Sequence, residues 1–199
     1  EMTSSLVGSE MCIETGIVGN PNCGKTTLFN ALTGSKQEVG NWPGVTVDKK
    51  TGRYTFEGND VEIVDLPGIY SITPASTSGE DERIARDYIL TDEAQAVINI
   101  VDASNLERNL YLTAQLIEMR VPMVVAVNML DIAKNHKIEV DLKALQQALG
   151  CPVVGLVAAR EQGVRELQKT VAEFLKNPQL PPMNVSFEDR IEKAREAIT

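Results

Sequence analysis

A glycine-rich segment at residues 19–26 carries the strongest chemical signal in the sequence. Its letters, GNPNCGKT, match the pattern G-x-x-x-x-G-K-[ST] and stand between an apolar run and a stretch with helical spacing. In this pattern, backbone N–H groups and a helix N-terminus surround phosphate oxygens. We therefore expect Lys25 to reach the outer phosphates and Thr26 to bind magnesium. A plain turn between strand and helix is the alternative, and it is disfavoured because both flanking elements are predicted.

The letters VDLPG at residues 64–68 end a later apolar run. Asp65 can hold the magnesium shell through water, and the N–H of Gly68 can donate to a terminal phosphate. Acidic residues before a Pro-Gly turn are common, so this segment alone would indicate only a turn. Its position one hairpin after the phosphate loop makes it the expected second half of the metal site.

Asn128 and Asp131 form an N-x-x-D pattern at the end of another apolar run, where ligands bind in open α/β sheets. A carboxylate can accept two hydrogen bonds from guanine, and adenine offers no matching pair. Each group left unpaired would cost about 1–3 kcal/mol, which favours GTP over ATP. The alternative is a helix N-cap Asp beside a loop Asn. Met129 stands where many GTPases have a lysine that covers the base, and we expect N–H groups of residues 157–159 to meet the guanine carbonyl.

Residues 37–48 form a Gly- and Pro-bearing loop between the first helix and the hairpin. This loop is a candidate mobile switch, and the Thr46 hydroxyl would close on magnesium when a third phosphate is bound. Trp42, the only tryptophan, is expected there as an exposed ring or in a small satellite core.

The sequence lacks two groups that accelerate phosphoryl transfer in other GTPases. Ile69 and Tyr70 follow Gly68 where Ras-like enzymes place a water-orienting Gln, and residues 35–48 contain no Arg. An arginine finger is worth about 10³–10⁵ in rate, so slow hydrolysis is expected. The side-chain oxygen of Asn22 could instead help to hold a monovalent cation, although hydrogen bonds that stabilise the loop are an alternative role.

The elements that must position these residues alternate along the chain. Apolar runs predict strands buried on both faces at 13–18, 61–66, 96–101, 123–127 and 152–157. Residues 52–57 and 61–66 predict a hairpin, because Gly58-Asn59-Asp60 separates them. Helices are expected at 25–32, 81–90, 106–119, 142–149, 164–175 and 187–198. The pattern indicates an α/β fold, a P-loop NTPase G domain with about six mostly parallel strands, one antiparallel edge strand and helices on both faces.

Composition narrows the function further. The chain of 199 residues carries 28 acidic and 19 basic side chains, for a net charge of -9, which disfavours a broad nucleic-acid-binding face. Three widely spaced cysteines indicate neither a disulfide framework nor a zinc site. No signal peptide or membrane-spanning run is predicted, so the fragment is expected to be soluble. We expect an N-terminal extension at 1–12, the G domain at 13–176, and at 177–199 a linker with the start of a truncated helical spacer domain.

Several longer segments resemble one family, the N-terminal G domain of ferrous-iron transport protein B (FeoB), a TrmE-Era-like GTPase group. The segments are GNPNCGKTTLFNALTG at 19–34, VGNWPGVTVDKKTG at 39–52, VDLPGIYSI at 64–72, VDASNLERNLYLT at 101–113 and NMLDIA at 128–133. The resemblance implies a GTP-binding and GTP-hydrolysing domain on the cytoplasmic side of a bacterial inner-membrane iron transporter. In that family potassium assists hydrolysis, which implies that Asn22 and the carbonyls of Gly40 and Trp42 bind K⁺.

Catalysis is assigned to Lys25, Thr46, Gly68 and Asn22, and Mg²⁺ binding to Thr26, Thr46 and Asp65. Nucleotide contacts are assigned to Gly19, Asn20, Pro21, Asn22, Cys23, Gly24, Lys25, Thr26, Thr27, Gly44, Val45, Thr46, Asp65, Leu66, Pro67, Gly68, Asn128, Met129, Asp131, Val157, Ala158 and Ala159. Expected partners are GTP or GDP and the transmembrane part of the same polypeptide, with no nucleic acid, and self-association stays open. A nucleotide-dependent binding module, in which hydrolysis is incidental, is the alternative function, and a ribosome-associated or tRNA-modifying GTPase is disfavoured by the acidic balance and the GNWPGVTV segment.

Overall fold

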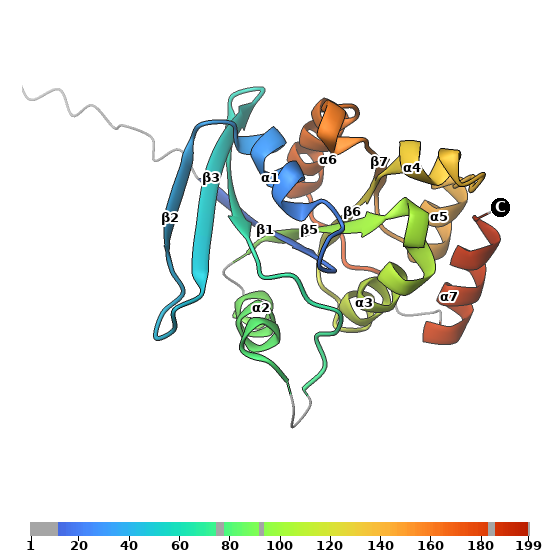
Figure 1. Ribbon diagram of the computed structural model, residues 1–199, viewed down its shortest axis with the longest axis horizontal. Coiled ribbons are helices and arrows are strands. Elements are labelled where there is room, and N and C mark those ends of the chain that lie inside the picture. Colours follow the sequence, from blue (N-terminus) through green and yellow to red (C-terminus); the bar gives the residue numbers. More distant parts are fainter. Residues whose placement is uncertain (1–11, 75–77, 92–93, 183–185, 199) are drawn as a thin grey trace, which may run out of the picture.

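A computed structural model describes residues 12–74, 78–91, 94–182 and 186–198. The predicted N-terminal extension therefore lies almost wholly outside the described residues. One sheet of seven strands has the order β2-β3-β4-β1-β5-β6-β7 (Figure 1). The strands are β1 (Ile13–Gly19), β2 (Gln37–Asn41), β3 (Asp48–Phe56), β4 (Asn59–Asp65), β5 (Ala96–Asp102), β6 (Met123–Asn128) and β7 (Val153–Gly155).

The sheet is parallel except around β3, which pairs antiparallel with both β2 and β4. The predicted α/β fold with a mostly parallel sheet is confirmed, but the sheet has seven strands instead of about six. The additional strand, β2, lies within residues 37–48, which the sequence analysis assigned to a loop. Four of its five residues are exposed, so it pairs along an edge without the buried apolar face by which strands are recognised in sequence.

Parallel pairing brings the ends of four strands to one edge of the sheet. The register aligns Ile17 with Asp65, Gly19 with Ile100, and Asp102 with Asn128. Since β1, β4, β5 and β6 run in the same direction, the loops that follow them all emerge at this edge.

Helices cover both faces of the sheet, and Figure 1 shows α1 and α6 above it with α2 and α3 below. The helices are α1 (Lys25–Thr33), α2 (Glu80–Leu90), α3 (Leu106–Glu118), α4 (Leu130–Asn135), α5 (Leu142–Leu149), α6 (Val164–Lys176) and α7 (Phe187–Glu196). Alternate residues of β5 enter different cores: Ile98 belongs to the cluster that contains residues of α1 and α6, whereas Val97 belongs to the cluster that contains residues of α2, α3 and α5. This alternation follows from the two-residue repeat of a strand.

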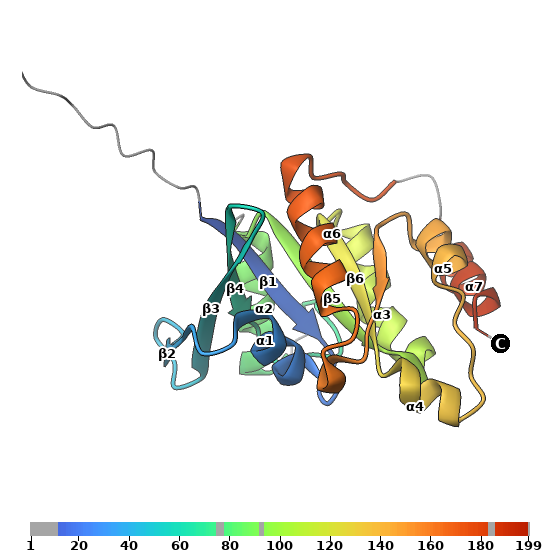
Figure 2. The same ribbon diagram turned by 90° about the horizontal axis from the view of Figure 1, so that it is seen from above.

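The last described helix, α7, packs against α3 and α5, and Figure 2 shows it beside α5. Ala194 is fully buried in the main core cluster. Arg190 is 3% exposed and donates to the carbonyl of Leu149 at 3.0 Å. Residues 187–196 thus pack against the G domain through α3 and α5. Their assignment to a separate spacer domain stays a prediction. None of the helices in the described part of the chain is sufficiently long and apolar to cross a membrane.

Candidate functional site

The phosphate loop joins β1 to α1, and each glycine in it is required by a neighbour. A Cβ on Gly19 would lie 2.6 Å from the carbonyl oxygen of Ile100, so β5 could not approach. Gly24 has φ +90 and lies against the amide of Asn128, while Asn22 has φ 65. These left-handed residues curl the loop so that the N-terminus of α1 faces the strand edge, a geometry suited to anions.

Lys25 and Asp65 form an ion pair at the centre of this edge. Their side chains are 13% and 8% exposed. A nearly buried carboxylate requires a cationic partner, and in this structure the Lys25 ammonium is that partner. Oxygen ligands suit Mg²⁺, so the Asp65 carboxylate and the Thr26 hydroxyl, at the exposed start of α1, fit the predicted magnesium site. Lys25 would then turn to the phosphates.

The turn after β4 is held directly on the phosphate loop. Leu66 donates from its N–H to Ile17 at 3.1 Å, and Ile69 donates to the carbonyl of Gly19 at 3.0 Å. A Cβ on Gly68 would lie 3.1 Å from the Cα of Pro21. The structure therefore brings the two predicted halves of the phosphate and metal site together, with Gly68 packed so closely on Pro21 that a side chain there would tighten the contact.

Asn128 is the last residue of β6 and lies at the strand edge where its motif placed it. It is 3% exposed, its Nδ2 donates to the carbonyl of Cys23 at 3.1 Å, and its Oδ1 accepts from the N–H of Ala158 at 2.9 Å. Asn128 therefore ties the phosphate loop to the loop after β7. In this structure its side chain joins two loops of the site and thereby positions them.

Asp131 lies in the first turn of α4, with its side chain 31% exposed. Its carboxylate is 3.9 Å from the guanidinium of Arg160. Met129, in the left-handed region with φ 61, starts the turn that leads into α4. This accessible carboxylate at the sheet edge is able to accept hydrogen bonds from a base, and its predicted contact with guanine stays a prediction.

Some backbone N–H groups in the loop after β7 already donate hydrogen bonds within the protein. Val157 donates to Gln162 at 3.0 Å, and Ala158 donates to Asn128. The N–H of Ala159 takes part in neither bond. Of the three residues predicted to meet a guanine carbonyl, Ala159 is thus the one whose N–H these bonds leave for that role.

The predicted switch residues lie apart from the phosphate loop. Figures 1 and 2 show the turn between β2 and β3 at the outer end of the sheet, away from the loop between β1 and α1. Gly40 pairs with Lys49 in the β2–β3 ladder, the carbonyl of Trp42 accepts from Val45 at 3.3 Å, and Thr46 is exposed. In this conformation the predicted K⁺ ligands are not gathered around Asn22, and Thr46 is not beside the magnesium residues.

Cys23 is a packing residue within the phosphate loop. Its side chain is 1% exposed in the core beneath α1. Burial raises the pKa of the Cys23 thiol to about 11, because the thiolate would lose its hydration. The neutral thiol therefore fills space, while the loop uses the backbone of this residue.

Sequence reasoning missed three features around the site. Arg160 faces Asp131, Arg108 lies over the Tyr70 ring at 4.7 Å, and Asn20 is 4% exposed with its Oδ1 lacking a hydrogen-bond partner among the described residues. Arg160 directly follows the predicted base-contacting loop, so its position in sequence was a usable signal. Arg108 is more than thirty residues from Tyr70 in sequence, and only the packing of α3 brings them together.

Comparisons with known proteins agree with this geometry. A family model described as ferrous iron transport protein B matches residues 13–171. The Fe(2+) transporter FeoB of Escherichia coli (strain K12) is 53% identical over 163 residues, which cover 81% of this chain and 21% of that protein. The chain thus spans about one fifth of the length of the curated relatives it matches.

Two solved structures are similar over most of the chain. The cytosolic domain of L. pneumophila FeoB has a TM-score of 0.80 and 45% identity, covering 87% of this chain and 72% of that one. A mutant of S. thermophilus NFeoB bound to GDP has a TM-score of 0.75 and 46% identity, covering 81% and 61%. The resemblance seen in the sequence is confirmed: this chain belongs to the ferrous iron transport protein B family and has the fold of its N-terminal G domain.

Proposed function

We propose that this chain binds GTP and GDP and slowly hydrolyses GTP with Mg²⁺ and K⁺, as the regulatory domain of a ferrous-iron membrane transporter. One observation carries the proposal: Lys25 and Asp65 are paired at the strand edge where Gly68 packs on the phosphate loop, and Asn128 ties this edge to the loop near Asp131. The S. thermophilus relative bound to GDP supports it.

Each residue has a defined task in hydrolysis. Magnesium, when bound, offsets charge on the outer phosphates. Lys25 leaves Asp65 to contact the phosphates, and the N–H of Gly68 donates to the third phosphate. Thr46 reaches the metal only after the switch loop moves. Since Ile69 cannot orient water by hydrogen bonding, slow turnover is expected.

Asn22 is the residue proposed to bring in the monovalent cation. It is exposed at the tip of the phosphate loop and would act with the carbonyls of Gly40 and Trp42 once the switch loop has closed. A cation at this point would supply the positive charge that an arginine finger supplies elsewhere.

Phosphate release tests this proposal. GTP turnover is measured in KCl and in NaCl at equal ionic strength, for the wild type and for Asn22→Ala. We expect faster turnover in potassium, loss of this difference in Asn22→Ala, and largely unchanged GDP binding. Asn135→Ala, which alters an exposed asparagine at the end of α4, is the matched control and should keep the potassium effect. Equal wild-type rates in both salts would refute the role of potassium.

The absence of a water-orienting side chain at Ile69 also favours the second candidate, a nucleotide-dependent binding module whose hydrolysis is incidental. A Thr46 variant of the whole transporter that binds GTP but cannot close the switch separates the two. Iron uptake that tolerates blocked hydrolysis but not blocked binding would support the module.

The remaining assignments concern the whole protein. We propose that residues 177–199 contain the linker and the start of a helical spacer leading to the transmembrane part, and that the G domain faces the cytoplasm. The short coverage of the curated relatives is consistent with a further part of the polypeptide.

A further inference from the structure

Trp42 is buried in a turn whose other residues are mostly exposed. Its side chain is 7% exposed, and it belongs to the main core cluster, whereas Asn41, Pro43 and Gly44 beside it are exposed. An exposed ring or a small satellite core was expected from the sequence, whereas the structure places the ring in the main core cluster. The turn is closed by a hydrogen bond from Trp42 N–H to the carbonyl of Val47 at 2.9 Å.

The site that receives the indole ring is built by α2 and β3. The Tyr88 ring meets Trp42 edge to face, with centroids 5.6 Å apart and planes at 77°. The Lys49 ammonium lies 4.8 Å from the centre of the Trp42 ring. A cavity of about 470 Å³ beside the indole is lined by Pro43, Ile84 and Tyr88, among others. Such aromatic and cation contacts favour a specific docked position.

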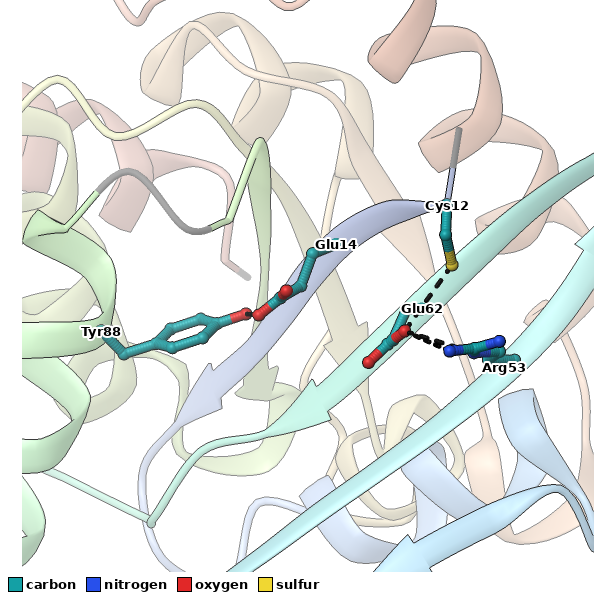
Figure 3. A network of polar contacts seen from close by, with 5 residues as sticks. All are labelled: Cys12, Glu14, Arg53, Glu62 and Tyr88. Carbon is teal, nitrogen blue, oxygen red and sulfur yellow. Dashed lines mark hydrogen bonds and ion pairs between the residues drawn. The ribbon is translucent and has the colours of Figure 1, made fainter. Parts of the chain in front are cut away.

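Tyr88 is itself fixed by β1. Its hydroxyl donates to Oε1 of Glu14 at 2.6 Å, and Figure 3 shows the ring reaching across to that carboxylate. A Cβ on Gly16 would lie 2.9 Å from Cε1 of Tyr88, so the glycine leaves the space that the ring occupies. Figure 3 also shows Glu62 on the neighbouring strand, β4. Its carboxylate forms an ion pair with Arg53 and accepts a hydrogen bond from the Cys12 thiol, so it is not a partner of Tyr88 in this network. Tyr88, against which Trp42 packs, is therefore held in place by β1, the central strand of the sheet.

One polar group opposes this docking. The Nε1 of Trp42 is buried and has no hydrogen-bond partner in the described part of the chain. A buried N–H without a partner destabilises the docked state, because the same N–H would donate a hydrogen bond to water once the ring left the core. The docked state is thus held by ring contacts and weakened by this N–H, a balance that a ligand can shift.

In this docked conformation the switch residues Trp42 and Thr46 are held in the turn between β2 and β3. The Trp42 carbonyl is engaged by Val45, and Thr46 stays in the outer turn. We propose that Tyr88 is a positioning residue that acts through Trp42, holding the switch loop open on α2 until the third phosphate of GTP draws Thr46 inward. This inference rests on the proposed function, and it deepens it by assigning the open state to a specific contact.

Intrinsic fluorescence tests the inference without any mutation, because Trp42 is the only tryptophan. Emission and acrylamide quenching are recorded with GDP and with a non-hydrolysable GTP analogue, in Mg²⁺ and K⁺, while calorimetry measures binding of each. We expect the bound analogue alone to shift emission to longer wavelength and to increase quenching. Binding of the analogue with unchanged emission and quenching would overturn the inference alone, as would an equal shift with GDP. Absence of binding would overturn the proposed function and the inference with it.

Variants of Tyr88 supply an independent measurement. Tyr88→Leu removes the ring contact, so the affinity for the analogue relative to GDP should rise about 2- to 12-fold, the factor that an aromatic pair represents. Tyr88→Phe keeps the ring and should stay close to the wild type in this ratio, even where Tyr88→Leu folds poorly. Tyr111→Leu alters an exposed tyrosine on α3 and is the matched control. A ratio in Tyr88→Leu equal to that of the wild type, or a ratio in Tyr88→Phe raised as far as in Tyr88→Leu, would contradict the role of the ring.

Discussion

Asn128 and Asp131 belong to one motif, yet the structure predicts that their substitution has separable consequences. Asn128→Ala removes two hydrogen bonds, at 3.1 and 2.9 Å, inside a region where Cys23 is 1% and Ala158 is 2% exposed. Each buried backbone group left unpaired costs about 1–3 kcal/mol. We therefore expect the free energy of unfolding to fall by about 2–6 kcal/mol in the absence of nucleotide.

Asp131→Asn should weaken GDP binding and leave the free energy of unfolding almost unchanged. The side chain is 31% exposed, and its only ion pair in the described residues, with Arg160, is 3.9 Å long. Exposed pairs of this kind contribute about 0–1 kcal/mol, so stability should change by less than about 1 kcal/mol. The affinity for GDP should fall at least about tenfold, because the base loses a carboxylate acceptor.

Thermal unfolding without nucleotide, together with calorimetric titration of GDP, measures both effects. At roughly 2–4 °C per kcal/mol for a chain of this size, Asn128→Ala should lower Tm by several degrees or more, and Asp131→Asn should leave it nearly unchanged. If Asn128→Ala unfolded at the wild-type temperature, its bridging role would be refuted. If Asp131→Asn bound GDP as tightly as the wild type, the assignment of the base contact would be wrong.

Three further predictions concern the phosphate loop and its surroundings. Lys25→Met leaves the carboxylate of Asp65 nearly buried without its cation, so denaturant unfolding should show a loss of about 3 kcal/mol, and a loss under 1 kcal/mol would contradict the ion pair. Gly68→Ala should push the turn off the phosphate loop, lowering phosphate release at saturating GTP while GDP binding persists; unchanged turnover would contradict the close contact. In the native protein at pH 8, a thiol reagent should label the exposed Cys12 but not Cys23, whose pKa burial raises to about 11; mass spectrometry after digestion that finds Cys23 labelled as well as Cys12 would contradict this packing.

The parts of the fold that the sequence predicted well are those with a strong apolar signal. β5 and β6 are buried on both faces, and their runs of Val, Ile and Ala gave bounds within one residue of those observed. β2 was missed because Gln37–Asn41 is polar and mostly exposed, so its pairing with β3 has no counterpart in hydrophobic periodicity. α4 (Leu130–Asn135) was missed because six residues are too few to establish a helical repeat.

In the site, too, features encoded in a short motif could be predicted from the sequence, whereas contacts that depend on tertiary packing could not. Motif spacing predicted that Lys25 and Asp65 serve one site, and the structure places them in contact. The bonds of Asn128 to two separate loops depend on the register of β6 against its neighbours, and a motif does not encode that register. The docking of Trp42 on α2 depends equally on tertiary packing, because Tyr88 is far from it in sequence.

Guanine selectivity is the measurement that tests the central claim most directly. Calorimetric titration of this chain with GDP, a GTP analogue and ATP, in the presence of Mg²⁺, compares the three affinities under one set of conditions. Binding of both guanine nucleotides, with ATP at least about tenfold weaker, is the predicted result. ATP binding as tight as that of GDP would contradict the assignment of Asp131 and, with it, the account of this site as a guanine-nucleotide site.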